Sequence, residues 1–172
     1  MESALSQVEI SREESGVLRE SITQSRIMLF GCSAYRSMCD ALFEQFQSGA
    51  GVILYRMGEG YARKVIEPVT KSHLKGDEAI KTYQRLAYVS GWGNMKLHML
   101  SEDSAECIVE KSAFVLRRPD VGDRSCFFLC GVLGAVATAI IGHRCVAREV
   151  SCETAGSQNC KFLVHGEDEG KG

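Results

Sequence analysis

The sequence predicts a single α+β domain, in which helices cover an antiparallel β-sheet mainly on one side. Three patterns support this class. Apolar residues recur at helical spacing in the first half, apolar and polar residues alternate in the second half, and an uncharged run separates two alternating regions. The 172 residues are enough for one hydrophobic core. We therefore divide the chain into a polar segment at 1–25, a domain at 26–166 and a tail at 167–172.

The first half of the chain is expected to be mainly helical. Residues 1–25 are polar and are predicted to be helical or flexible, and they could form a dimer contact. Residues 29–46 place apolar side chains at helical spacing before the break at 48–51, which predicts an amphipathic helix. The run at 52–60 fits either a strand or a turn of helix. Further along, acids followed by periodic apolar residues predict a helix that stops near Gly91.

The second half predicts two antiparallel hairpins with a helix between them. Segments 94–103 and 105–116 alternate with a period of two, and two further strand-like runs flank a turn at 154–158. The uncharged run at 125–142 is of borderline length for a membrane span, but its glycines and cysteines dilute its hydrophobicity, so a buried helix is favoured. Its small residues form one flat face that lets a helix lie close against a sheet: Gly131, Ala135, Thr138 and Gly142.

The composition of the chain argues against several classes of function, such as nucleic-acid binding. Twenty basic and 22 acidic side chains give a net charge of −2, which disfavours direct binding to nucleic acid or anionic lipid. Eight cysteines occur in a chain whose start lacks an apolar signal sequence, so we expect a cytoplasmic protein with reduced thiols or metal ligands. Neither a nucleotide-binding loop nor a catalytic triad order is visible, so a binding role is favoured over an enzyme.

Four residues in the last third could form a metal site. A hairpin turn places Cys152 and Cys160 opposite each other, with Cβ atoms about 4.5–5.5 Å apart. Glu149 would point to the other face of a regular strand, so a shared site requires a bulge or strong twist near residues 150–151. Cys126 begins a helix, whose positive dipole end lowers the pKa of a thiol. The four side chains would complete a closed tetrahedral zinc site, or they are separate buried thiols and a carboxylate.

The segment 112–166 closely resembles the 4-vinyl reductase domain family. The family pattern is a cysteine that opens a glycine-containing helix, then E-x-x-C, a glycine turn and C-x-F. Here these positions are Cys126, Gly131 and Gly134, Glu149 with Cys152, Gly156, and Cys160 with Phe162. In related phenol-sensing domains of NtrC-type activators, Cys, Glu and two Cys at the same spacings bind zinc beside an aromatic-effector pocket. The resemblance therefore implies Zn(2+) at Cys126, Glu149, Cys152 and Cys160.

The resemblance also implies a ligand-binding fold, shared with subunits of a Golgi-transport tethering complex and with a protein associated with bacteriochlorophyll vinyl reduction. A cavity between helix and sheet would be apolar with one or two polar groups. Each aromatic candidate also fits an ordinary core position, Cys130 is most simply a core thiol, and His98 could equally face solvent. The candidate pocket residues are Trp92, His98, Phe114, Phe128 and Cys130.

These observations predict a zinc-stabilised sensor domain that binds a small apolar or aromatic molecule. The family's sensor members carry ATPase and helix-turn-helix modules, and nothing in these 172 residues resembles either. The domain is therefore expected to act through a homodimer interface or a downstream protein partner. Two alternatives are a thiol/zinc redox sensor, in which oxidation releases the metal, and an accessory protein in tetrapyrrole vinyl reduction.

Overall fold

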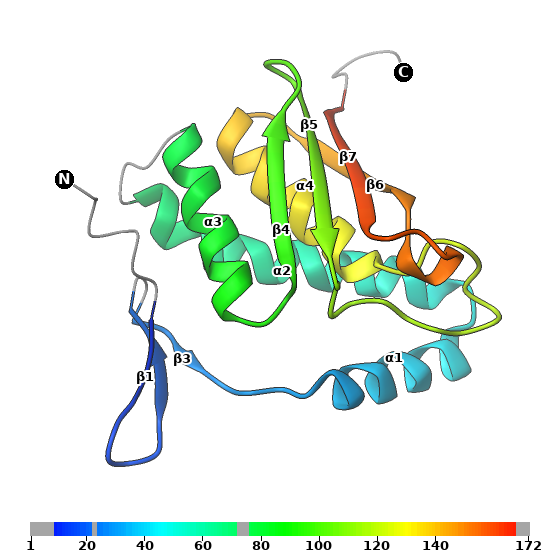
Figure 1. Cartoon of the computed structure of the whole chain (residues 1–172), viewed down its shortest axis with the longest axis horizontal. Helices are drawn as coiled ribbons and strands as arrows, with labels where there is room; N and C mark the ends of the chain where they lie inside the picture. The colour runs from blue at the N-terminus through cyan, green and yellow to red at the C-terminus, as the bar shows by residue number, and fades with distance from the viewer. Residues whose placement is uncertain (1–8, 22–23, 72–75, 168–172) are drawn as a thin grey trace.

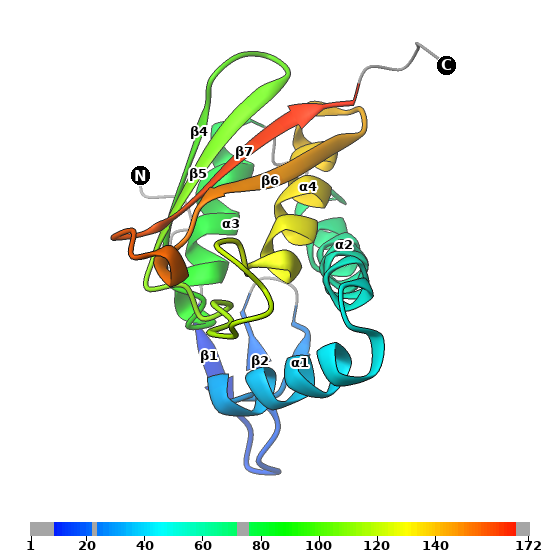
Figure 2. The ribbon, with the colours of Figure 1, turned by 90° about the vertical axis from the view of Figure 1, so that its right-hand side faces the viewer.

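The computed structural model describes residues 9–21, 24–71 and 76–167, with only the backbone of 66–71. Within these residues, the main sheet has four antiparallel strands in the order β4-β5-β7-β6. Its strands are β4 (Asn94–Met99), β5 (Ser104–Glu110), β6 (Cys145–Ser151) and β7 (Cys160–Gly166). Figures 1 and 2 show the larger helices on one side of this sheet. The predicted α+β class is confirmed.

The helical layer consists of α2 (Gly49–Lys71), α3 (Asp77–Val89) and α4 (Phe127–Ile141). Helix α3 packs on β4, while α4 lies between α2 and strand β6. Leu129, Val132, Leu133 and Val136 on α4 have no exposed surface, so the predicted buried helix is confirmed. Among the described residues, no helix is both long enough and apolar enough to cross a membrane.

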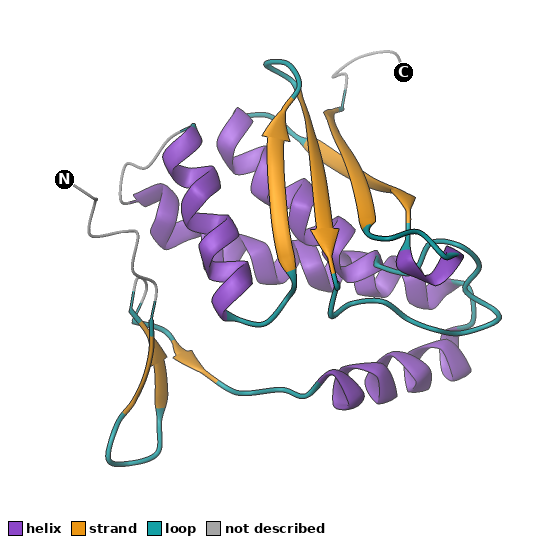
Figure 3. Ribbon diagram, in the orientation of Figure 1, coloured by secondary structure: helices purple, strands orange, loops and turns teal. Residues whose placement is uncertain are grey.

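The run at 52–60, which fitted either strand or helix, lies within α2 (Figure 3). Helices α2 and α4 approach each other at backbone distance. A Cβ atom at Gly58 would lie 2.0 Å from the carbonyl oxygen of Phe128, and one at Gly131 would lie 1.9 Å from that of Tyr55. The small face of α4 therefore contacts helix α2 at Gly131, and it meets the sheet, as expected, at Thr138. Gly134 also approaches β6, where its Cβ would lie 3.2 Å from the carbonyl oxygen of Cys145, and the Thr138 hydroxyl accepts the backbone N–H of Cys145.

The N-terminal region differs from the prediction. Residues 1–25 were expected to be helical or flexible, but their described part contains β1 (Ile10–Arg12) and β2 (Leu18–Glu20), which pair with β3 (Arg26–Ile27) in a small antiparallel sheet. A short segment then leads to α1 (Cys32–Phe46), the amphipathic helix predicted at 29–46. Residues 1–8 and 22–23 lie outside the described residues, as does most of the predicted tail.

Strand β5 ends earlier than the alternating pattern at 105–116 suggested. Lys111 has a positive φ of 55°, which turns the chain out of the sheet immediately after Glu110. The loop that follows leads to the start of α4. Because this loop crosses the end of the sheet, it brings Ser125 and Cys126 close to the second hairpin.

Candidate metal centre and ligand pocket

Cys126, Glu149, Cys152 and Cys160 come together at one end of the sheet. Cys126 is the residue immediately before α4, Glu149 lies on β6, Cys152 follows β6, and Cys160 begins β7. One ligand atom from each lies within 4.8 Å of the others. The three cysteines have no exposed surface and Glu149 is 3% exposed, so water does not compete for these groups. The arrangement can hold a metal ion.

The strand irregularity required by the sequence is present. Glu149 pairs with Phe162, but Ser151 pairs with Lys161, so Val150 is an extra residue in β6. Such a bulge shifts the side-chain alternation by one position. As a result, Glu149 and Cys152 reach the same site although they are three residues apart. The bulge predicted near residues 150–151 is confirmed.

The distances between donor atoms match a tetrahedral centre. Sγ of Cys160 lies 3.7 Å from Sγ of Cys126 and 3.7 Å from Sγ of Cys152. A zinc–sulfur bond of about 2.3 Å in tetrahedral geometry places two sulfurs about 3.8 Å apart. Oε2 of Glu149 accepts hydrogen bonds from the backbone N–H groups of Ser125 at 2.8 Å and Cys126 at 3.0 Å. The buried Oε1 atom has no hydrogen-bond partner among the described residues, as a free metal ligand would.

Hydrogen bonding and burial shift the pKa values within the cluster. Hydrogen bonds from the Cys126 and Cys160 thiols hold the pKa of Cys152 well below its usual range, and the Thr154 hydroxyl lies 2.9 Å from the same sulfur. Hydrogen bonding to Cys152 and then to Cys160, followed by burial, raises the pKa of Cys126. Burial raises the pKa of Glu149 to about 7. The lowered pKa expected for Cys126 at the start of α4 is found at Cys152, while Cys126 donates its thiol hydrogen bond to Cys160.

A cavity of about 660 Å³ lies between the N-terminal segment, α1, α2 and the start of α4. Three of the predicted pocket residues line it: Trp92, Phe114 and Phe128. Trp92 and Phe114 meet edge to face with ring centroids 4.9 Å apart, while Phe114 and Phe128 stack at 5.1 Å. Aromatic walls of this kind suit a flat apolar or aromatic molecule. The cavity is lined by Ile10, Arg26–Gly31, Tyr35, Met38, Cys39, Leu42, Leu54, Met57, Tyr61, Val89, Ser90, Trp92, Phe114 and Phe128.

Two predicted pocket residues lie elsewhere. His98 is exposed, because Met95 and Leu97 on β4 point into the core and the alternation turns His98 to the opposite face. This alternation was visible in the sequence. Cys130 is 8% exposed and belongs to the hydrophobic core, where burial raises its pKa to about 12. Neither residue lines the cavity.

Sequence reasoning missed the contribution of Tyr35 and Tyr61. Tyr35 on α1 packs edge to face on Phe114, with ring centroids 5.4 Å apart. The ring centroids of Tyr61 on α2 and Trp92 are also 5.4 Å apart. Tyr61 and Trp92 also wall a smaller cavity of about 70 Å³, where the buried hydroxyl of Tyr83 has no hydrogen-bond partner among the described residues. The helical periodicity of 29–46 identified the inner face of α1, but it did not show which distant rings that face would meet.

The metal cluster and the aromatic cavity meet at the start of α4. Cys126 is a candidate metal ligand, and Phe128, two residues later, is a wall of the cavity. Phe127 lies between them and packs on Phe43 of α1 at 6.1 Å. A metal ion bound to Cys126 would therefore fix the first turn of α4, and with it the position of the Phe128 ring in the cavity wall.

Comparison with solved structures identifies the fold. The chain superposes on the crystal structure of the phenol-responsive sensory domain of the transcription activator PoxR with phenol, with a TM-score of 0.77 and 16% identity over 94% of this chain and 87% of that chain. This protein shares the fold of that sensory domain. The resemblance seen in the sequence is thus confirmed at the level of the fold.

Two further structures have the same fold at lower similarity. A vinyl-4-reductase family protein from Methanocaldococcus jannaschii gives a TM-score of 0.57 and 17% identity, over 86% of this chain and 87% of that chain. Subunit 3 of a trafficking protein particle complex from Naegleria fowleri, covalently bound to palmitic acid, gives a TM-score of 0.59 and 16% identity. The match covers 82% of this chain and 95% of that chain. Comparison with protein-family models and with curated proteins gives no match.

Proposed function

We propose that this chain is a zinc-stabilised sensor domain that binds a small apolar or aromatic molecule. The observation that carries the proposal is the aromatic cavity of about 660 Å³, one wall of which begins two residues after a candidate metal ligand. The fold shared with a phenol-responsive sensory domain supports the same conclusion. We assign both sites to the predicted domain at 26–166, to which Ile10 adds one cavity contact.

Zinc is the metal that suits the cluster best. Three thiols and one carboxylate, with sulfurs 3.7 Å apart, agree with a four-coordinate structural site. Soft thiolate donors select zinc over the hard cations magnesium and calcium. Four protein ligands leave no open position for an activated water, so the metal would join the second hairpin to α4 and would not catalyse a reaction.

Metal analysis of Cys152→Ser tests the zinc assignment. We expect one zinc per chain in the native protein, and loss of the metal in the variant together with several kcal/mol of stability, because structural zinc sites contribute about 10 kcal/mol or more to folding. The matched control is Cys107→Ser, another buried thiol on the sheet but outside the cluster. A metal-free native protein, or equal zinc content in both variants, would contradict the assignment.

The single tryptophan offers a direct test of ligand binding, since Trp92 lies in the cavity wall. Phenol, naphthol and palmitate are titrated while the fluorescence of Trp92 is recorded. We expect saturable quenching by at least one of the aromatic probes, weakened about tenfold by Phe128→Ala, which removes a stacking ring. His98→Ala, on the opposite face of the sheet, serves as the control and is expected to bind normally. Quenching that is unsaturable, or equally affected in both variants, would refute the pocket.

We further propose that the domain transmits ligand binding through a homodimer interface or to a downstream protein partner. The segment joining β3 to α1 supports an interface, because Met28, Leu29 and Phe30 are 78%, 70% and 51% exposed. Contiguous exposed apolar side chains of this size are typical of protein contacts. Eight free cysteines support a reducing compartment such as the cytoplasm.

The alternative role as a thiol/zinc redox sensor has weaker support. The three cluster cysteines are fully buried, so an oxidant reaches them only if the site opens. The other alternative, an accessory function in vinyl reduction, is supported only by the fold shared with a vinyl-4-reductase family protein.

A further inference from the structure

A further concave feature shares no lining residue with the aromatic cavity. It is a hollow of about 150 Å³ between α2, the C-terminal half of α4 and the start of β6. Its floor is built from small or buried side chains, Ala135, Thr138 and Cys145, and its rim carries Arg56, Glu59, Arg63 and Arg144. Three guanidinium groups thus surround one small depression.

The rim has more positive charge than its carboxylates neutralise. Arg56 forms an ion pair with Glu59 at 2.7 Å, and Arg63 approaches the same carboxylate at 3.7 Å. Arg144 pairs with Glu167 on the far side. Two carboxylates against three guanidinium groups leave one formal positive charge. Bringing like charges together without full compensation is unfavourable, and a bound anion relieves it.

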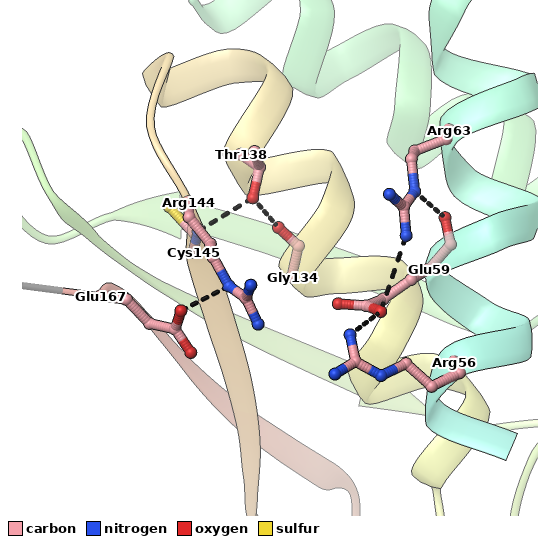
Figure 4. Close-up of polar contacts among 8 residues, drawn as sticks. All are labelled: Arg56, Glu59, Arg63, Gly134, Thr138, Arg144, Cys145 and Glu167. Carbon is pink, nitrogen blue, oxygen red and sulfur yellow. Dashed lines mark hydrogen bonds and ion pairs between the residues drawn. The ribbon is translucent and has the colours of Figure 1, made fainter. Parts of the chain in front are cut away.

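The arginines are oriented toward a common space. Figure 4 shows the guanidinium of Arg144, the residue before β6, directed across the hollow toward Arg56 and Glu59 on α2. Among the described residues, Glu167 pairs with Nε of Arg144, and none accepts a hydrogen bond from its two terminal nitrogens (Figure 4), although a guanidinium offers five N–H donors. Planar guanidinium groups with unused donors match the two oxygens of a carboxylate.

The floor of the hollow is held in place by Thr138. Its hydroxyl donates to the carbonyl oxygen of Gly134 at 2.8 Å and accepts the backbone N–H of Cys145 at 2.9 Å. These bonds join α4 to the start of β6 and leave no hydroxyl proton of Thr138 for a ligand. The arginines on the rim therefore carry the recognition.

We propose that this hollow is a docking site for an acidic segment of a partner protein, whose Asp or Glu side chain enters between Arg56 and Arg144. The arginines are 58–70% exposed, so a small free anion would be held weakly by screened charges. A peptide segment adds main-chain and apolar contacts along α2 and α4. The proposal requires neither the metal nor the aromatic ligand.

Its position would connect such a partner to the ligand pocket. Helix α2 presents Met57 and Tyr61 to the aromatic cavity and Arg56, Glu59 and Arg63 to the hollow. A partner seated on the hollow would therefore contact the same helix that lines the cavity.

Fluorescence anisotropy of a labelled oligoglutamate peptide tests the site, with oligoglutamine as the uncharged comparison. We expect Arg144→Gln and Arg56→Gln each to weaken oligoglutamate binding by about fivefold, the upper range for an exposed ion pair. Arg148→Gln is the matched control, because Arg148 is an exposed arginine on β6 outside the hollow. It is expected to change binding by less than about twofold. Thermal unfolding of each variant confirms that the fold is retained.

Three outcomes would overturn the proposal. The first is an absence of oligoglutamate binding, and the second is an equal loss in Arg148→Gln, which would indicate only general attraction to basic residues. The third is binding of a different occupant through Arg144, either inorganic phosphate in place of the peptide or phosphatidylglycerol vesicles. The fluorescence titration of Trp92 is independent of all three, so failure here leaves the proposed ligand site untouched.

Discussion

The two oxygen atoms of Glu149 have different environments. Oε2 accepts the backbone N–H groups of Ser125 and Cys126, which are otherwise without partners at the start of α4. Oε1 is buried beside the sulfurs and has no hydrogen-bond partner among the described residues. A single side chain therefore both satisfies the helix end and supplies the fourth donor of the candidate metal site.

The substitution Glu149→Gln separates these two roles. The amide oxygen that it introduces can still accept the two N–H groups, but the neutral amide is a poorer zinc ligand than a carboxylate. We expect zinc affinity to fall by about 10–100-fold, measured by competition with a chromophoric chelator. Glu153→Gln, on the adjacent turn and outside the cluster, is the control. Unchanged affinity in Glu149→Gln would mean that the carboxylate is not a ligand.

At the scale of secondary-structure elements, the contact between α2 and α4 determines the helical layer. The two glycines at the crossing, Gly58 and Gly131, each face a backbone carbonyl of the other helix. Helices this close leave no room for a Cβ atom. The crossing holds α4 between α2 and β6, and so sets where the first turn of α4 lies relative to the metal cluster and the cavity.

Two alanine substitutions measure this contact. Gly131→Ala is expected to destabilise the fold by about 2–3 kcal/mol, because its Cβ would lie 1.9 Å from the carbonyl oxygen of Tyr55 and the helices must separate. Gly60→Ala, on α2 with nothing within 4 Å of its Cβ, is expected to stabilise by up to about 1 kcal/mol through helix propensity. Chemical denaturation gives both values. Similar effects of the two substitutions would contradict the close crossing.

At the scale of the whole molecule, the N-terminal sheet and α1 lie beside the main body, and an exposed apolar segment joins them (Figure 1). Met28 and Leu29 also line the aromatic cavity. The surface proposed for dimer contact is therefore part of the cavity wall. Association with a second copy would close one side of the cavity, so ligand binding and oligomeric state are expected to influence each other.

The oligomeric state of Leu29→Glu tests this arrangement. We expect the native protein to be a dimer by light scattering coupled to gel filtration, and the variant to be a monomer, since a charge at this position would be buried without a partner in the interface. Leu100→Glu provides the control, because Leu100 is 60% exposed in the turn between β4 and β5 and lies outside the cavity. A monomeric native protein, or dissociation of both variants, would refute the interface.

Several features followed from the sequence because they depend on local pattern. Alternation predicted the hairpins, helical spacing predicted α1 and α3, and the spacing of Glu149 and Cys152 required the bulge that is found at Val150. The same alternation allowed His98 to face solvent, and His98 is exposed on the outer face of β4. Each of these depends on neighbours within a few residues, where backbone geometry fixes side-chain direction.

Only the tertiary structure decided which distant groups meet. It placed Gly131 of α4 against α2, brought Tyr35 to Phe114 and Tyr61 to Trp92, and placed Arg144 across the hollow from Arg56 (Figure 4). The small N-terminal sheet also appeared only in the structure, because its polar strands are short and depend on pairing across turns. Such contacts arise where helices and strands that are far apart in sequence pack together. The periodicity of a single segment therefore does not predict them.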